Sequence, residues 1–112
     1  MQSEAIALQL EASRRAAKLN AMVLADEDGL CVASSGDMPN DEIAVYTAML
    51  GNKVENFEGT LYSKDSRYNV RIRRFSLGDQ RLFLCAVGGG GEARASEIHR
   101  SLGGVQRILA AA

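Results

Sequence analysis

The stretch Ala21-Met-Val-Leu-Ala-Asp-Glu-Asp-Gly-Leu-Cys-Val-Ala-Ser-Ser-Gly36 consists of two short apolar runs separated by an acidic segment that ends in glycine. Each run is far shorter than the roughly 20 apolar residues that span a membrane. Asp28 and Gly29 favour the positive φ angles of a two-residue turn, so the stretch predicts a β-hairpin. Its first strand, Ala21–Ala25, is apolar throughout and is expected to be covered on both faces. Its second strand, Leu30–Ser35, becomes more polar and suits a sheet edge.

A helix is predicted on each side of this hairpin. The first covers residues 3–19, with Ser3 as its N-cap and Asn20 at its end. The second runs from Asn40 to Phe57, because Pro39 suits a first helical turn and apolar residues then recur every three or four positions. The first helix has the apolar rows Ile6, Leu10, Ala17 and Leu8, Ala12, Ala16, Leu19, and the second has Ile43, Tyr46 or Thr47, Leu50, Val54 and Phe57.

The C-terminal half predicts three more strands and a helix. Residues 60–63 suit a short strand, residues 68–77 a longer one, and the wholly apolar run Leu82–Val87 a second strand covered on both faces. The alternation of the longer strand shifts at Arg74, which predicts a bulge, and Gly78-Asp79 predicts a hairpin turn. The last helix has the apolar stripe Ile98, Leu102, Val105 and Leu109. The predicted order is therefore α-β-β-α-β-β-β-α.

The composition is that of one folded domain. The chain has 112 residues, of which 46% are hydrophobic and 24% charged, so residues 1–112 are expected to form a single domain. Glu4 and Glu11 interrupt the N-terminal apolar residues, unlike a secretory signal. Cys31 and Cys85 are too few and too far apart for a disulfide framework or a metal site. We therefore expect a cytoplasmic protein with two reduced thiols.

The charges are unevenly distributed along the chain. Residues 26–58 hold eight acidic residues and one lysine, whereas residues 64–81 hold six basic and two acidic residues. Oppositely charged surfaces favour protein partners and self-association. A pI near 5.8 and the lack of an aromatic stacking platform argue against nucleic-acid binding. Arg71, Arg73 and Arg74 are either a docking surface or the solvated face of a strand.

Ala44, Ala48 and Gly51 form a row of small side chains on the second predicted helix. A glycine inside a helix costs about 1 kcal/mol relative to alanine, so Gly51 indicates that another segment approaches closely. That segment is either the protein's own sheet or the same helix of a second copy.

The sequence contains no arrangement typical of a catalytic or cofactor site. His99 is the only histidine, and it has no Cys or Ser at a local spacing suited to catalysis. The acidic segment 26–28 lacks the further oxygen ligands of a calcium loop. Gly88–Gly91 lacks the Lys-Ser/Thr pair of a nucleotide loop and is expected only to connect strand and helix. We therefore expect no enzymatic activity, no metal and no cofactor.

The segments Val23-Leu-Ala-Asp-Glu-Asp-Gly-Leu-Cys-Val-Ala-Ser-Ser-Gly36 and Arg81-Leu-Phe-Leu-Cys-Ala-Val-Gly88, together with the order of elements, resemble the roadblock family. That family contains dynein light chains of roadblock type and bacterial and archaeal regulators of Ras-like GTPases. The resemblance covers nearly the whole chain. It implies an α/β (α+β) fold, with a five-stranded antiparallel sheet that carries one helix on one face and two on the other.

The resemblance also implies a function. Family members usually dimerise by joining their sheets edge to edge with the middle helices side by side, and they commonly act as platforms rather than as catalysts. For this chain it implies a homodimer that binds a Ras-like GTPase or another roadblock protein. Abundant Arg, Ala and Gly indicate a bacterial source, where such pairs serve polarity and motility. The implied dimer residues are Ala44, Ala48, Gly51, Thr60, Leu61 and Tyr62, and the implied partner-binding residues are Asp41, Glu42, Val45, Asn52, Lys53 and Glu55.

Two other functions stay open. A sensory α/β domain would bind a small ligand in a cavity lined by Cys31, Cys85 and Met49, between sheet and helix. A weak hydrolase would depend on Cys31 or His99.

Overall fold

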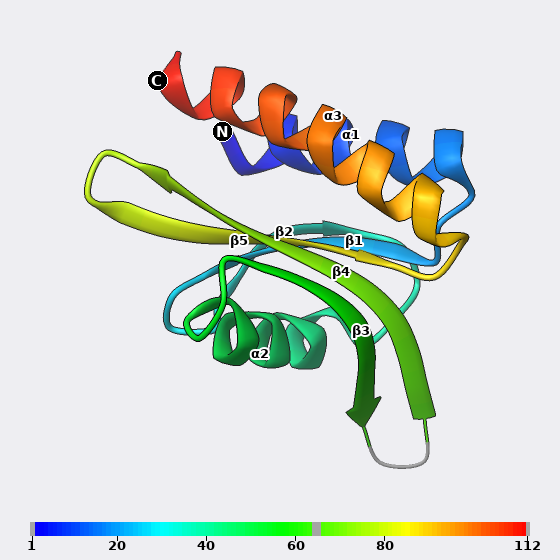
Figure 1. Ribbon diagram of the computed structural model, residues 1–112. Helices are drawn as coiled ribbons and strands as arrows, with labels where there is room; N and C mark the ends of the chain where they lie inside the picture. Colours follow the sequence, from blue (N-terminus) through cyan, green and yellow to red (C-terminus); the bar gives the residue numbers. More distant parts are fainter. Residues whose placement is uncertain (1, 64–65, 112) are drawn as a thin grey trace.

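The computed structural model describes residues 2–63 and 66–111, which form a five-stranded antiparallel sheet between two helical layers (Figure 1). The strands lie in the order β2-β1-β5-β4-β3, so β2 and β3 are the two edges. The predicted order of elements and the five-stranded sheet are confirmed. The elements are α1 (Gln2–Ala17), β1 (Ala21–Asp26), β2 (Cys31–Ser35), α2 (Asn40–Gly51), β3 (Asn56–Ser63), β4 (Ser66–Leu77), β5 (Gln80–Val87) and α3 (Gly91–Ala110).

The sheet has a helical layer on each face. α2 covers one face, and α1 and α3 lie together on the other (Figure 1). Along β1, Val23 contributes to the core on the α2 side, and Met22 and Leu24 contribute to the core on the side of α1 and α3. β5 alternates in the same way. The double cover explains why both strands are apolar at almost every position, as predicted. None of the described helices is long and apolar enough to cross a membrane.

The turn between β1 and β2 has three residues rather than the predicted two. The Gly29 amide donates to the Asp26 carbonyl at 3.1 Å, and the Asp26 amide donates to the Leu30 carbonyl at 3.0 Å. Among the turn residues only Gly29 has a positive φ, 89°. The Asp26 carboxylate accepts hydrogen bonds from the amides of Asp28 and Leu30 at 2.9 and 3.0 Å. These bonds stabilise the longer loop, so the acidic segment forms the turn and Asp28 needs no left-handed conformation.

α1 begins one residue before the predicted N-cap Ser3, which lies inside the helix. It ends at Ala17, and Lys18 follows with a φ of 56°. Ile6 and Leu10 are buried as predicted, but most of the second apolar row faces solvent. Leu8 is 72% exposed. The sheet and α3 cover only one side of this helix, so they bury only one of two apolar rows.

α2 is six residues shorter than predicted, because it ends at Gly51 and not at Phe57. The Asn52 side chain donates to the Ala48 carbonyl at 2.9 Å at the end of the helix. Phe57 belongs to β3, where it pairs with Ile72 of β4 and packs on the α2 side of the sheet. The spacing between Leu50 and Phe57 would place both side chains on one face of a helix. Backbone pairing with β4 instead places Phe57 in a strand. Pro39 lies at the N-cap, one position before the first helical turn.

The predicted bulge in β4 is wrong. β4 pairs with β5 without interruption from Val70 to Leu77, and Gly78, with a φ of 62°, opens the predicted two-residue turn. Ile72 packs on the α2 side of the sheet, whereas Phe75 packs on the side of α1 and α3. The shift in the sequence pattern is therefore a change of buried face. For the same reason Arg74 faces α2, and the three arginines at 71, 73 and 74 do not share one face.

Candidate partner-binding surfaces

The small residues of α2 face the protein's own sheet. Ala44 is 0% and Ala48 3% exposed within one chain. A Cβ added at Gly51 would lie 2.3 Å from Cδ1 of Phe83 on β5. The glycine is therefore explained by the close approach of α2 to its own sheet, which is one of the two alternatives left open by the sequence. We infer that this row has little surface left for a second copy.

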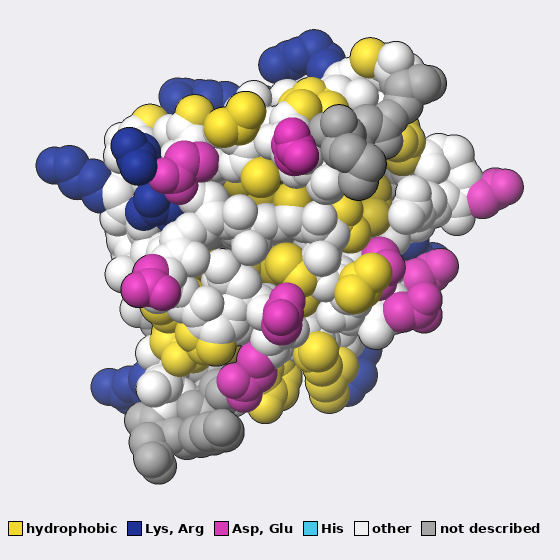
Figure 2. Space-filling model, turned by 180° about the vertical axis from the view of Figure 1, so that it is seen from behind, with side chains coloured by type: hydrophobic (Ala, Val, Ile, Leu, Met, Phe, Trp, Pro, Cys, Tyr) yellow, Lys and Arg dark blue, Asp and Glu magenta, His cyan; other side chains and the backbone are white. Residues whose placement is uncertain are grey.

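The opposite side of α2 is exposed. We call Asp41, Val45 and Met49, which follow one another at four-residue intervals, the α2 outer face. Val45 is 47% and Met49 55% exposed. Leu30 and Val54 are also exposed, and Gly29, which precedes Leu30 in the β1–β2 turn, lies against Val45. Figure 2 shows acidic and hydrophobic side chains together over the lower part of the molecule, where α2 lies. This mixture of apolar and acidic groups suits recognition of a protein surface.

The segment after α2 continues this surface. Asn52, Lys53 and Glu55 are all exposed, and Asn52 also bonds to its neighbours. The Asn52 amide donates to the Glu27 carbonyl at 3.2 Å, and its oxygen accepts a bond of 3.4 Å from Arg81. Asn52 therefore links the β1–β2 turn, the end of α2 and β5. Five of the six residues predicted to bind a partner are exposed, namely Asp41, Val45, Asn52, Lys53 and Glu55, and Glu42 is half-buried. Asn52 has this structural role as well.

The outer edge of β3 is open in the single chain. β3 pairs with β4 along its whole length and has no strand on its other side. β4 pairs with β5 only from Val70 onward, so the ends of β3 and β4 extend beyond the other strands and curve towards the α2 side (Figure 1). Leu61 is 6% and Tyr62 69% exposed, and Thr60 is half-buried. An open edge of this length can pair with another strand.

Arg94 fixes the glycine-rich connection to the edge of the sheet. It is 7% exposed, and it donates to the carbonyls of Gly88 and Gly89 at 2.9 and 2.8 Å. It also donates to Glu58 of β3 at 2.7 Å. The connection between β5 and α3 is thus held to the edge of the sheet through its carbonyl groups by Arg94. The sequence analysis missed Arg94, and its position near the N-terminus of a helix, where acidic residues are usual, was the available signal.

Similarity to known proteins is found among solved structures. No family model matches the sequence, and no curated protein matches it. The chain is similar to the solved structure of gliding protein MglB from Thermus thermophilus, with 16% identity, a TM-score of 0.76 and coverage of 99% of this chain and 93% of that one. The chain has the roadblock fold.

Two other solved structures have this roadblock fold in common with the chain. A structure of MglB in a tetrameric arrangement has 14% identity and a TM-score of 0.76, with 96% of this chain and 89% of that chain covered. A Roadblock/LC7 domain from Streptomyces avermitilis has 16% identity and a TM-score of 0.69, with 92% and 96% covered. The structural likeness thus spans nearly the whole domain in each case.

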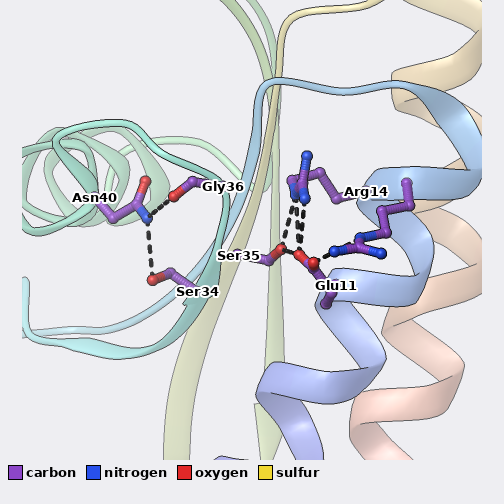
Figure 3. A network of polar contacts seen from close by, with 7 residues as sticks. Glu11, Arg14, Ser34, Ser35, Gly36 and Asn40 are labelled. Carbon is purple, nitrogen blue, oxygen red and sulfur yellow. Dashed lines mark hydrogen bonds and ion pairs between the residues drawn. The ribbon is translucent and has the colours of Figure 1, made fainter.

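In this roadblock fold, a polar network ties α1 to the edge strand β2 (Figure 3). The Ser35 hydroxyl donates to Glu11 and accepts a bond of 2.8 Å from Nε of Arg14. Arg15 donates to the other oxygen of Glu11 at 2.7 Å. The hydrogen bonds from Ser35 and Arg14 lower the pKa of the Glu11 carboxyl from 4.5 to about 2. Glu11 is therefore charged at neutral pH and holds β2 against α1.

We expect Glu11→Gln to remove part of the acid sensitivity of folding. The folded pKa lies below the ordinary value, so the carboxylate stabilises the fold above about pH 4.5, and this contribution is lost as the pH falls towards 2. The free energy of unfolding, measured with denaturant from pH 2 to 7, should be higher for wild type than for the variant at neutral pH. The two values should converge near pH 2. Glu4→Gln, on the exposed side of the same helix, is the control. A difference between wild type and Glu11→Gln that does not change with pH would contradict this prediction.

The groups considered for catalysis or ligand binding are not brought together. His99 is exposed on α3. Burial raises the pKa of the Cys85 thiol to about 12, and burial also raises that of Cys31. Met49 is 55% exposed on the α2 outer face while Cys85 is fully buried, so the cavity considered for a sensory domain is not formed by these residues. Within residues 2–63 and 66–111, no group of three His, Cys, Asp or Glu could hold a metal ion.

Proposed function

We propose that this protein is a non-enzymatic regulatory scaffold that acts as a homodimer and binds a Ras-like GTPase or another roadblock protein. The roadblock fold, shared over almost the whole chain with MglB structures, is the observation that carries the proposal. The name of the Thermus protein, a gliding protein, supports a role in bacterial motility or polarity. The GTPase would supply the nucleotide and the chemistry, and this protein would bias or tether it.

The open edge of β3 supports the dimer. Two antiparallel β3 strands can join two sheets into one continuous sheet. The two-fold axis would keep both α2 helices on the same face. The residues of the contact are then Thr60, Leu61 and Tyr62 on β3, whereas Ala44, Ala48 and Gly51 support it indirectly by holding α2 close to its sheet.

The α2 outer face supports the binding of a partner. A dimer formed through β3 would present two copies of it, together with Lys53 and Glu55, on one side of the joined sheet. Exposed apolar groups supply contact area, and the acidic side chains select a complementary, basic surface on the partner. We assign the partner-binding role to Asp41, Glu42, Val45, Lys53 and Glu55, with Asn52 shaping the surface.

We expect Asp41→Lys together with Glu55→Lys to weaken binding of the partner by about tenfold at low salt, and by less at high salt, because exposed charges are screened. Each purified Ras-like GTPase of the source organism, loaded with GDP or with a GTP analogue, is titrated against the variant and the wild type by calorimetry. The matched control is Asp79→Lys with Glu92→Lys, which changes two exposed acidic residues on other elements. Equal loss in both double variants would indicate only a general charge effect. Wild-type protein that binds none of these GTPases and no other roadblock protein would contradict the proposed function.

A further inference from the structure

The exposed side of α1 has an apolar row that is not covered by any other part of residues 2–63 and 66–111 whose side chains are described. Ala5, Leu8, Ala12 and Ala16 are all exposed and follow one another at three- or four-residue intervals. We call these residues the α1 outer row. Leu8, its one large member, is 72% exposed. Single exposed apolar residues are normal, but a row with helical spacing is the pattern with which one helix packs against another.

An open groove lies beside this row. It has a volume of about 460 Å³ and is lined by Glu4, Ala7, Leu8, Glu11, Ser34 and Ser35. The groove therefore runs between α1 and the edge strand β2. Figure 2 is seen from this face and shows hydrophobic side chains between the upper helical layer and the sheet. Glu11 and Ser35 bond to each other. Ser34 accepts a bond of 3.2 Å from Asn40. Leu8 is itself part of the groove wall, so the groove lies directly beside the α1 outer row.

The charges along α1 suggest what covers the row. Glu4 lies in the first turn, and Arg15 lies in the last, where its side chain is 74% exposed although it bonds to Glu11 at 2.7 Å. At about 100° per residue the two positions differ by only about 20° around the helix axis, so both flank the row on the same side. A second α1 helix placed antiparallel would bring its Arg15 to Glu4 and its Glu4 to Arg15.

We propose that α1 is a second contact surface for another copy of this chain. The two α1 helices pack antiparallel about a two-fold axis. Leu8 of each copy lies against Ala12 of the other, and Glu4 of each copy adds a second carboxylate to Arg15 of the other, which already bonds to Glu11 of its own helix. In this register a large side chain meets a small one at both contacts. The contact lies at the opposite end of the sheet from the β3 edge, so it is additional to the proposed dimer and does not depend on it.

The same surface fits a second copy better than an unrelated peptide. A two-fold contact requires that one patch be complementary to itself. The α1 outer row meets this requirement twice, because it carries both the large and the small side chains and both signs of charge. If the contact through α1 and the contact through β3 both form, each chain has two partners, and dimers associate further as concentration rises.

Charge exchange between two variants tests the proposal. Glu4→Arg and Arg15→Glu are each examined by sedimentation equilibrium up to several hundred micromolar, alone and as an equimolar mixture. All are made in a chain that also carries Thr60→Lys and Tyr62→Lys at the β3 edge, so that the two contacts are measured separately. Each variant alone places like charges at both ends of the α1 pair, and we expect self-association about tenfold weaker than with wild-type α1. In the mixture both ion pairs are restored between unlike chains, and association should return to the starting level.

Leu8→Gln tests the apolar part of the contact at nearly constant side-chain size. Because Leu8 is mostly exposed, thermal unfolding should be unchanged while self-association through α1 falls by about tenfold. The inference is overturned if the single charge variants associate like the parent, if their mixture does not recover, or if Leu8→Gln has no effect. None of these results changes the outcome of the GTPase titrations or of the β3-edge experiment, so failure here and failure of the proposed function are distinguishable.

Discussion

Gly51→Leu is expected to destabilise the fold by about 3 kcal/mol, the upper range for overpacking a filled core. The backbone of α2 lies so close to β5 that even the first added carbon would be 2.3 Å from the Phe83 ring. Phe83 is fully buried and cannot move aside without disturbing the central strand. Denaturant unfolding measures the loss in the free energy of unfolding. The dependence of that free energy on denaturant concentration should stay unchanged, because the same surface is exposed on unfolding.

Two further variants locate the cause of this effect. Gly103→Ala, also inside a helix, would place its Cβ no closer than 3.4 Å to the flexible end of Arg107, so it should gain up to about 1 kcal/mol from helix propensity. Phe83→Ala alone should cost about 3 to 5 kcal/mol. In the double variant Gly51→Leu and Phe83→Ala, the leucine fills the vacated space, so the combined loss should be well below the sum. Additive losses would contradict a direct contact between the two positions.

The concentration dependence of the same measurement separates the two roles considered for Gly51. If the glycine served only contact with a second copy, Gly51→Leu would lower stability by weakening the dimer, and the loss would depend on protein concentration. Contact with Phe83 within one chain predicts a loss that is the same at every concentration.

The parts of the fold that the sequence predicted are those with a local or strongly periodic signal. β1 and β5 are apolar at nearly every position because helices cover both sheet faces, and this pattern is visible without knowledge of their partners. The turn at Gly78 and the stripe of α3 are equally local. The errors arose where distant contacts decide between two local alternatives. Phe57 continues the spacing of α2, yet it joins β3 because β4 offers backbone partners there.

The candidate site was predicted less completely, for related reasons. The exposed acidic residues of α2 are on the surface as expected, but a sequence pattern cannot tell which of two apolar rows on a helix is covered. Leu8 belongs to the second of the two predicted apolar rows and is 72% exposed. Arg94 was missed because its partner Glu58 lies 36 residues earlier in the chain. The row of small residues on α2 correctly indicated a close approach, and only the structure identified Phe83 as the group that approaches.

At protein concentrations too low for the proposed α1 contact to form, Thr60→Lys together with Tyr62→Lys is expected to convert a dimer of about twice 12.0 kDa into a monomer in sedimentation experiments. These residues lie on the open edge strand, where lysine is a common natural device against edge-to-edge pairing. In an antiparallel β3 pair about a two-fold axis, four added charges would meet within a few residues. Each of the two pairs of opposed like charges costs up to about 1 kcal/mol, so the dissociation constant should rise by up to about 30-fold.

The control places lysines where they leave the proposed contact untouched. Ser76→Lys and Gln80→Lys change two exposed residues beside the β4–β5 turn, and this variant should remain a dimer. Neither pair of lysine substitutions removes buried apolar surface. The single subunit of both variants should therefore unfold at nearly the same denaturant concentration as the single subunit of wild type. Since two α2 outer faces are presented together only when β3 pairs with β3, the monomeric variant should also bind the GTPase more weakly. A wild-type chain that sediments as a monomer, or a lysine variant that stays dimeric even when Leu8→Gln has removed the α1 contact, would mean that β3 is not the joining edge.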